Sequence, residues 1–222
     1  MTWNDDFILI LAALVLVIPH LVVRWRNARR GMRRSRSQSP RIDEAVEHSY
    51  RFRVGFALGR LPAPPAKRLA VVTCMDARIP VEALLGLAPG EAHVLRNAGG
   101  VISDDALRSL ILSHHELGTQ EVLIVQHTDC GLSHVREDAL RARLERITGA
   151  RPPVPERFHA FTDLATSVRT QLRRVQAHPW LAGRVVARGF IYDVRTGHLG
   201  EIADAEGLAG AAGDVSPVAA AE

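Results

Sequence analysis

Short runs of apolar, β-branched residues alternate with helix-like segments, and this alternation constrains the fold more than any other feature. Residues 69–74 (LAVVTC), 92–96 (AHVLR) and 121–126 (EVLIVQ) have the length and composition of buried strands. Strands that alternate with helices predict an α/β fold with a mainly parallel central sheet flanked by helices. The helices expected between and after these strands span 81–87, 103–117, 134–147 and 158–177.

The end of this region carries a different signal. Residues 185–194 and 199–202 read as two strands joined by a four-residue turn, which predicts an antiparallel hairpin at the edge of the sheet. A short amphipathic helix is expected at 42–57, before a proline-rich break. We therefore expect one folded domain at 42–205, followed by a flexible Ala/Gly-rich tail at 206–222.

The basic charge is confined to the start of the chain. Of the 28 lysines and arginines, eight arginines lie in residues 1–41 with only two acids, which leaves residues 42–222 with a formal charge of −2. A nucleic-acid-binding surface needs basic residues across the folded domain, so this distribution excludes one. Residues 26–41 are typical of a solvated basic linker, and their arginines could also lie on anionic headgroups.

Residues 7–23 form a run of 17 residues without a formal charge, flanked by Trp3 and Trp25. Its length and flanking aromatics favour a single membrane anchor within residues 1–25. Arginines follow the run, so the positive-inside rule places the domain at 42–205 in the cytoplasm, on the inner membrane. A cleaved signal peptide would have the opposite charge order. If translation begins later, for example at Met32, the domain would be cytoplasmic without an anchor.

Three residues offer metal ligands at the ends of the predicted strands. Cys74 and His127 each end a strand, and Cys130 lies in the turn after His127. Parallel strands place their carboxyl ends at one edge of a sheet, so these side chains are expected in one crevice. Two thiolates and an imidazole suit Zn²⁺, and three protein ligands leave one position open for catalysis. A closed zinc site, a buried disulfide and two buried hydrophobic cysteines are the alternatives.

Asp76 and Arg78 lie directly after Cys74. If both face the crevice, Arg78 can hold the carboxylate in a two-pronged ion pair, and Asp76 can accept a hydrogen bond from hydroxide on the metal. Asp76 could instead become the fourth zinc ligand and close the site. An isolated Asp-x-Arg pair is more often a surface salt bridge, so the position beside Cys74 carries this interpretation.

Three motifs occur in a fixed order along the body of the chain: CMDAR at 74–78, RNAGG at 96–100 and HTDCG at 127–131. Their order and spacing resemble the β-class carbonic anhydrases, and the likeness runs from about residue 45 to 205. The resemblance implies Zn²⁺ on Cys74, His127 and Cys130, with Asp76 paired to Arg78. It also implies a homodimer, or a dimer of dimers, with an N-terminal helical arm that crosses to the partner and maps onto 42–57.

The function that this resemblance implies is reversible hydration of CO₂ to bicarbonate and a proton, by attack of zinc-bound hydroxide. Backbone amides of Ala98, Gly99 and Gly100 are candidates for holding the bicarbonate anion. A carbonyl sulfide or carbon disulfide hydrolase shares the same motifs and is the main alternative. A non-catalytic, zinc-bound scaffold tethered to the membrane is the second alternative, and the intact Asp76–Arg78 pair argues against it.

Overall fold

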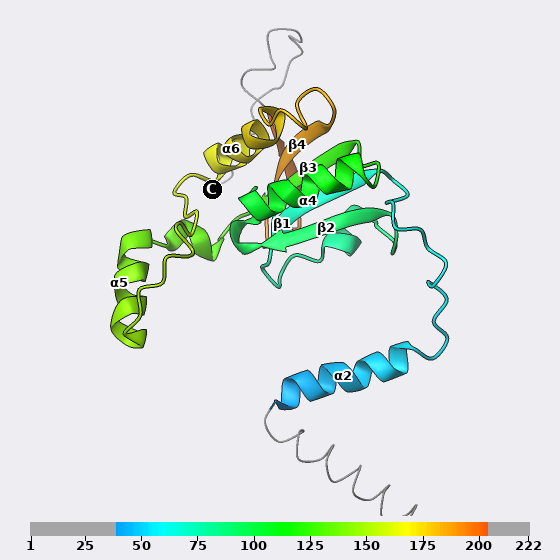
Figure 1. Ribbon diagram of the computed structural model, residues 1–222, viewed down its shortest axis with the longest axis horizontal. Helices are drawn as coiled ribbons and strands as arrows, with labels where there is room; N and C mark the ends of the chain where they lie inside the picture. Colours follow the sequence, from blue (N-terminus) through cyan, green and yellow to red (C-terminus); the bar gives the residue numbers. More distant parts are fainter. Residues whose placement is uncertain (1–38, 204–222) are drawn as a thin grey trace, which may run out of the picture. The chain divides into compact units, whose positions relative to one another are not determined.

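The computed structural model describes residues 39–203 (Figure 1). The predicted membrane anchor, most of the basic linker and the C-terminal tail fall outside these residues. Within 39–203, no helix combines the length and apolar character needed to cross a membrane. The chain divides into two units, at residues 1–60 and 61–222.

The first unit contains the helix α2, Pro40–Phe52. Pro40 starts the helix with a preset φ, and Asp43 near the start and Arg51 near the end complement the helix dipole. The helix ends five residues before the predicted boundary, and Gly55 follows in a left-handed conformation (φ 80°). None of its residues is buried within the chain, although it carries several large apolar side chains.

The second unit is built on a five-stranded sheet of order β2-β1-β3-β4-β5. The first four strands run parallel, and β5 pairs antiparallel with β4 at the edge. The predicted α/β class, with its parallel sheet and edge hairpin, is confirmed. The strands are β1 Leu69–Cys74, β2 Ala92–Asn97, β3 Glu121–His127, β4 Val186–Tyr192 and β5 Leu199–Ile202.

The same unit contains the α-helices α3 Val81–Leu85, α4 Asp104–His115, α5 Glu137–Thr148 and α6 Leu164–Gln176. In Figure 1, α5 stands apart from the sheet. Alternate strand residues face opposite sides, as the two-residue period of a strand requires. Ala70 and Val72 join one buried cluster with residues of α4 and α6, whereas Val71 joins a second cluster with residues of α3. Strand β1 is therefore buried on both faces, which explains its continuous apolar sequence.

Two predicted helices begin later than expected. Residues Gly131–His134 form a short 3-10 turn (η2), so α5 begins at Glu137 and not at 134. Helix α6 begins at Leu164 and not at 158, because His159 adopts a left-handed conformation and Asp163 caps the helix by accepting a hydrogen bond from the Thr166 amide (2.7 Å). The prediction for α4 holds, with Ser103 as its cap.

A tight turn follows β2 and reaches the ends of the neighbouring strands. The turn is η1, Ala98–Gly100, and both of its glycines have positive φ angles (81° and 60°). An added Cβ at Gly100 would lie 3.0 Å from backbone atoms of Thr73, Cys74 and Val125. Only glycine allows the turn to approach β1 and β3 this closely, at the carboxyl edge of the sheet.

Candidate metal centre

The carboxyl ends of β1 and β3 bring three potential metal ligands together. Cys74 is the last residue of β1, His127 is the last residue of β3, and Cys130 lies in the turn that follows. One ligand atom from each residue lies within 4.8 Å of the other two, and all three residues are buried. The three side chains are therefore brought together as predicted, whereas the role of each residue as a ligand stays a prediction.

The imidazole of His127 is oriented by its own turn. Its Nδ1 atom lies 2.9 Å from the backbone carbonyl of Thr128, which accepts the ring proton. The other nitrogen, Nε2, is buried and has no hydrogen-bond partner within residues 39–203. A buried acceptor without a partner is costly, and metal-binding histidines characteristically donate from the opposite nitrogen to a carbonyl. The ring is thus prepared to offer Nε2 to a metal ion.

The two thiols differ in acidity. Burial raises the pKa of Cys74, but the neighbouring His127 imidazole and the backbone amides of Asp76 and Gly99 outweigh burial and lower it to about 7. Burial raises the pKa of Cys130, and the nearby Cys74 adds to this effect. The Gly99 N–H donates directly to the Cys74 sulfur (3.3 Å). Cys74 is therefore readily available as a thiolate, the form that binds a metal.

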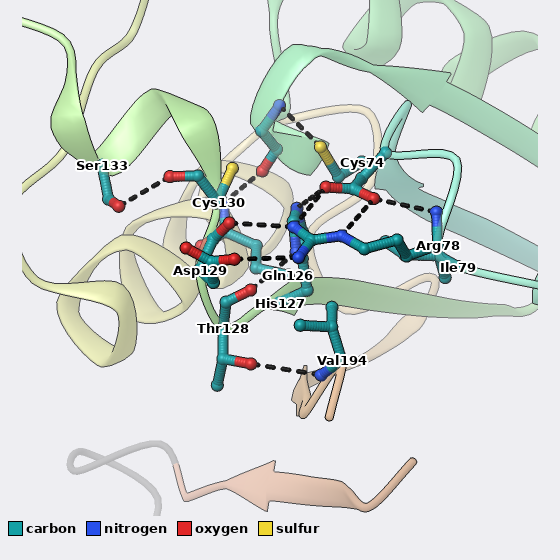
Figure 2. A network of polar contacts seen from close by, with 12 residues as sticks. Cys74, Arg78, Ile79, Gln126, His127, Thr128, Asp129, Cys130, Ser133 and Val194 are labelled. Carbon is teal, nitrogen blue, oxygen red and sulfur yellow. Dashed lines mark hydrogen bonds and ion pairs between the residues drawn. The ribbon is translucent and has the colours of Figure 1, made fainter. Parts of the chain in front are cut away.

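Asp76 and Arg78 form the expected two-pronged ion pair beside these ligands (Figure 2). The Arg78 Nε and Nη2 atoms donate to the two carboxylate oxygens of Asp76 at 3.0 and 2.8 Å, and the Arg78 amide adds a third bond at 2.9 Å. These bonds hold the pKa of Asp76 well below its usual range. One Asp76 oxygen lies 3.8 Å from His127 Nε2, so the ionised carboxylate borders the ligand cluster.

Arg96 supports the loop that carries this pair, and the sequence did not single it out. Its guanidinium donates to the backbone carbonyls of Cys74 (3.0 Å), Asp76 (2.6 Å) and Ile79 (3.3 Å). These three bonds fix the backbone from the end of β1 to the start of α3. The RNAGG motif contained the residue, but no local signal indicated that its partners would be carbonyls on another strand's loop.

The loop at 98–100 was predicted to hold the bicarbonate anion through its amides. In the structure the Gly99 amide donates to the Cys74 sulfur, and the Gly99 carbonyl accepts from buried Gln126 (2.8 Å). This amide therefore serves the candidate ligand Cys74. The proposed contacts of Ala98 and Gly100 with substrate stay predictions.

Comparison with known proteins agrees with this arrangement. The family model described as carbonic anhydrase matches residues 69–199. Beta-carbonic anhydrase 1 of Mycobacterium tuberculosis is 42% identical over 161 residues, covering 72% of this chain and 96% of the relative. A carbon disulfide hydrolase of Acidithiobacillus thiooxidans is 33% identical over 71% of this chain and 89% of its own length. The solved carbonic anhydrase of Streptococcus mutans has a TM-score of 0.69 at 36% identity and covers 73% of this chain and 97% of its own.

The chain is thus an α/β protein with a mainly parallel sheet and a candidate metal centre at the carboxyl ends of β1 and β3. The chain belongs to the carbonic anhydrase family, in its β-class. The prediction of a carbonate dehydratase is thereby confirmed. The scaffold alternative gains no support from these relatives, which carry the names of enzymes.

Proposed function

We propose that the chain hydrates CO₂ reversibly, using Zn²⁺ held by Cys74, His127 and Cys130. One observation carries the proposal: three buried ligand atoms lie within 4.8 Å of one another, beside a carboxylate paired with an arginine. Two thiolates and one imidazole match the ligand preference of Zn²⁺. A set of three protein ligands leaves one coordination position for water or substrate, which is the pattern of catalytic zinc.

When bound, Zn²⁺ would supply Lewis acidity, which lowers the pKa of a water molecule and makes it nucleophilic near neutral pH. Asp76 stays ionised in this range, because its hydrogen bonds with Arg78 lower the pKa of the carboxyl group. An ionised carboxylate only accepts hydrogen bonds, so Asp76 would orient the water for attack on CO₂. We also propose that Asp76 can leave Arg78 and become the fourth ligand, which would close the site.

The test is CO₂ hydration by the zinc-loaded full chain, followed by stopped-flow at pH 7.5 and pH 9. We expect activity in the parent protein and loss of stoichiometric zinc in Cys74→Ser, measured by elemental analysis. Met75→Leu is the matched control, since this neighbouring side chain is exposed and contributes no ligand. Absence of hydration at both pH values would reject the proposed reaction, and a full complement of zinc in Cys74→Ser would reject the ligand assignment.

A carbon disulfide or carbonyl sulfide hydrolase is the second candidate. A relative named carbon disulfide hydrolase shares 33% identity over 71% of this chain, so the metal ligands alone do not separate the two reactions. The identity to a β-carbonic anhydrase is higher, at 42% over 72% of the chain, which favours CO₂. Turnover of CO₂, carbonyl sulfide and carbon disulfide by one zinc-loaded preparation distinguishes the candidates.

We propose that α2 is the arm through which two copies form a dimer, which could pair further into a dimer of dimers. Ile42, Val46 and Tyr50 recur at four-residue spacing and are 63%, 45% and 64% exposed. Apolar residues at this spacing form one face of a helix, and such a face needs cover. Ile42→Glu with Tyr50→Glu should shift the protein toward monomer in light scattering, whereas Glu44→Gln should not. An unchanged molar mass in the double variant would contradict the arm.

We further propose that residues 7–23 anchor the protein in the inner membrane, with the catalytic domain in the cytoplasm. The support is the uncharged 17-residue run and the eight arginines that follow it within residues 24–41. Cell fractionation together with sequencing of the mature N-terminus tests this. Recovery of a chain that begins near Met32 in the soluble fraction would instead favour a later translation start.

A further inference from the structure

The guanidinium of Arg78 is shared between two carboxylates. Its Nε and Nη2 atoms hold Asp76, while Nη1 donates to the Asp129 carboxylate at 2.8 Å (Figure 2). Nη2 also donates to the backbone carbonyl of Asp129 at 3.0 Å. Within residues 39–203, Asp129 supplies the only hydrogen bond to Nη1. Arg78 is therefore fixed at one edge by Asp76 and at the other by Asp129.

Asp129 reaches Arg78 through an uncommon backbone conformation. It lies between His127 and Cys130 and has a φ of 54°, in the left-handed region. Aspartate enters this region more readily than most residues with a side chain. The conformation directs both the carboxylate and the backbone carbonyl of the same residue at one guanidinium. A turn that serves only to connect two ligands has no need for this double contact.

We propose that Asp129 is a positioning residue that holds Arg78 in the orientation from which its Nε–Nη2 edge binds Asp76. The Arg78 side chain is 46% exposed and flexible, so a second contact at Nη1 removes rotations that would turn the guanidinium away from Asp76. The inference rests on the proposed function, because the consequence of positioning Asp76 is catalytic. Asp129 itself touches neither a candidate metal ligand side chain nor substrate in this role.

A second carboxylate could also weaken the pair by competing for the same cation. The solvent exposure of the two carboxylates indicates whether Asp129 restrains Arg78 or weakens its pair with Asp76. The Asp129 side chain is 67% exposed and that of Asp76 is 18% exposed, so solvent screens the charge of Asp129 far more. The hydrogen-bond restraint on Nη1 depends on contact and persists under this screening. The hydrogen bond from Asp129 to Nη1 therefore restrains Arg78 more than the Asp129 charge weakens the ion pair. Removal of the Asp129 carboxylate should loosen the Asp76–Arg78 pair.

Two substitutions separate the side chain from the backbone. Asp129→Gly accepts the left-handed conformation without strain and keeps the backbone carbonyl, so it removes the side chain with its carboxylate and leaves the backbone contact. Asp129→Asn tolerates the same conformation and keeps one oxygen acceptor for Nη1, while it removes the charge. Asp138→Asn, at an exposed position in the first turn of α5, changes the net charge equally without touching Arg78.

The first measurement is the NMR signal of the Arg78 Nε–H group in the metal-free protein, identified by its loss in Arg78→Lys. We expect hydrogen exchange of this group to quicken in Asp129→Gly by up to about fivefold, the range for an exposed ion pair. Asp129→Asn should lie between Asp129→Gly and the parent, and Asp138→Asn should match the parent. Equal exchange in Asp129→Gly and the parent would overturn the proposal.

The second measurement is steady-state CO₂ hydration by the zinc-loaded variants at one fixed pH. Asp129→Gly should lower kcat by up to about fivefold with little change in KM and with stoichiometric zinc, and Asp129→Asn should recover most of it. A parent enzyme without activity would reject the proposed function, but the exchange measurement would still test the hold on Arg78. An active parent with an unchanged kcat in Asp129→Gly would overturn the catalytic consequence.

Discussion

Replacing Gly100 with alanine adds one methyl group at a position where the backbone of two strands leaves no space. The added Cβ would lie 3.0 Å from the Cys74 nitrogen, the Thr73 carbonyl carbon and the Val125 oxygen. These are backbone atoms of β1 and β3, held in place by the sheet, so no flexible side chain can move aside. Gly100 also has a φ of 60°, which alanine adopts only with strain.

The expected loss has two parts. A left-handed conformation costs an alanine about 1–2 kcal/mol, and an extra methyl group in a packed region typically costs about 1–3 kcal/mol. Gly118 supplies the matched control, because its φ is 74° and an added Cβ would meet nothing within 4 Å. We therefore expect Gly118→Ala to lose only the first part. The difference between the two variants should be about 1–3 kcal/mol of unfolding free energy.

The assay is urea unfolding of the metal-free proteins at one protomer concentration, since association would otherwise change the apparent stability. Zinc affinity by chelator competition is the second readout. Displacement of the Cys74 nitrogen should weaken zinc binding in Gly100→Ala, whereas Gly118→Ala should retain the parent affinity. If the two variants lose equal stability and bind zinc equally, then the close approach of this turn does not position Cys74.

Two further predictions concern the backbone support of the candidate site and the pH dependence of folding stability. Arg96→Lys should weaken zinc binding by about tenfold or more, because one ammonium cannot span three carbonyls. Arg108→Lys is the control, and equal zinc affinity of Arg96→Lys and the parent would contradict the support of the site by Arg96. Partial burial raises the pKa of Glu137, but two backbone amides outweigh it and hold the pKa below its usual value. The ionised group therefore stabilises the fold above about pH 4.5, and this contribution is lost as the pH falls. Glu137→Gln should reduce the unfolding free energy more at pH 7 than at pH 4, and an equal reduction at both would contradict the assignment.

The sheet could be predicted because its signal is local. A run such as residues 69–74 has no polar face, and only a strand covered on both sides accommodates it. The helix boundaries were harder to predict from the sequence. Apolar residues before Leu164 extend the helical pattern of α6 backwards, but the Asp163 cap and the left-handed His159 end it. The signal that was present, an aspartate three residues before Thr166, is short and easily missed beside a longer periodic pattern.

The part of the candidate site that lies at strand ends could be predicted from the sequence. Cys74 and His127 end neighbouring parallel strands, so their proximity follows from the fold class. The partners of Arg96 and Asp129 do not follow, because each contact depends on a loop conformation. Asp129 carries no sequence signal beyond its place between His127 and Cys130. Its contact with Arg78 becomes visible only in the structure, where Asp129 has a φ of 54°.

Different hydrogen bonds hold the backbone of the candidate site and the side chain of Asp76. The backbone around Cys74 and Asp76 is held by Arg96, and the Cys74 sulfur is also held by the Gly99 amide. The Asp76 side chain, in contrast, is held by hydrogen bonds from Arg78. A move of Asp76 from Arg78 toward the ligand cluster must therefore be a rotation of its side chain, because its backbone carbonyl is fixed. The candidate ligands can keep their positions while the neighbouring carboxylate changes partner.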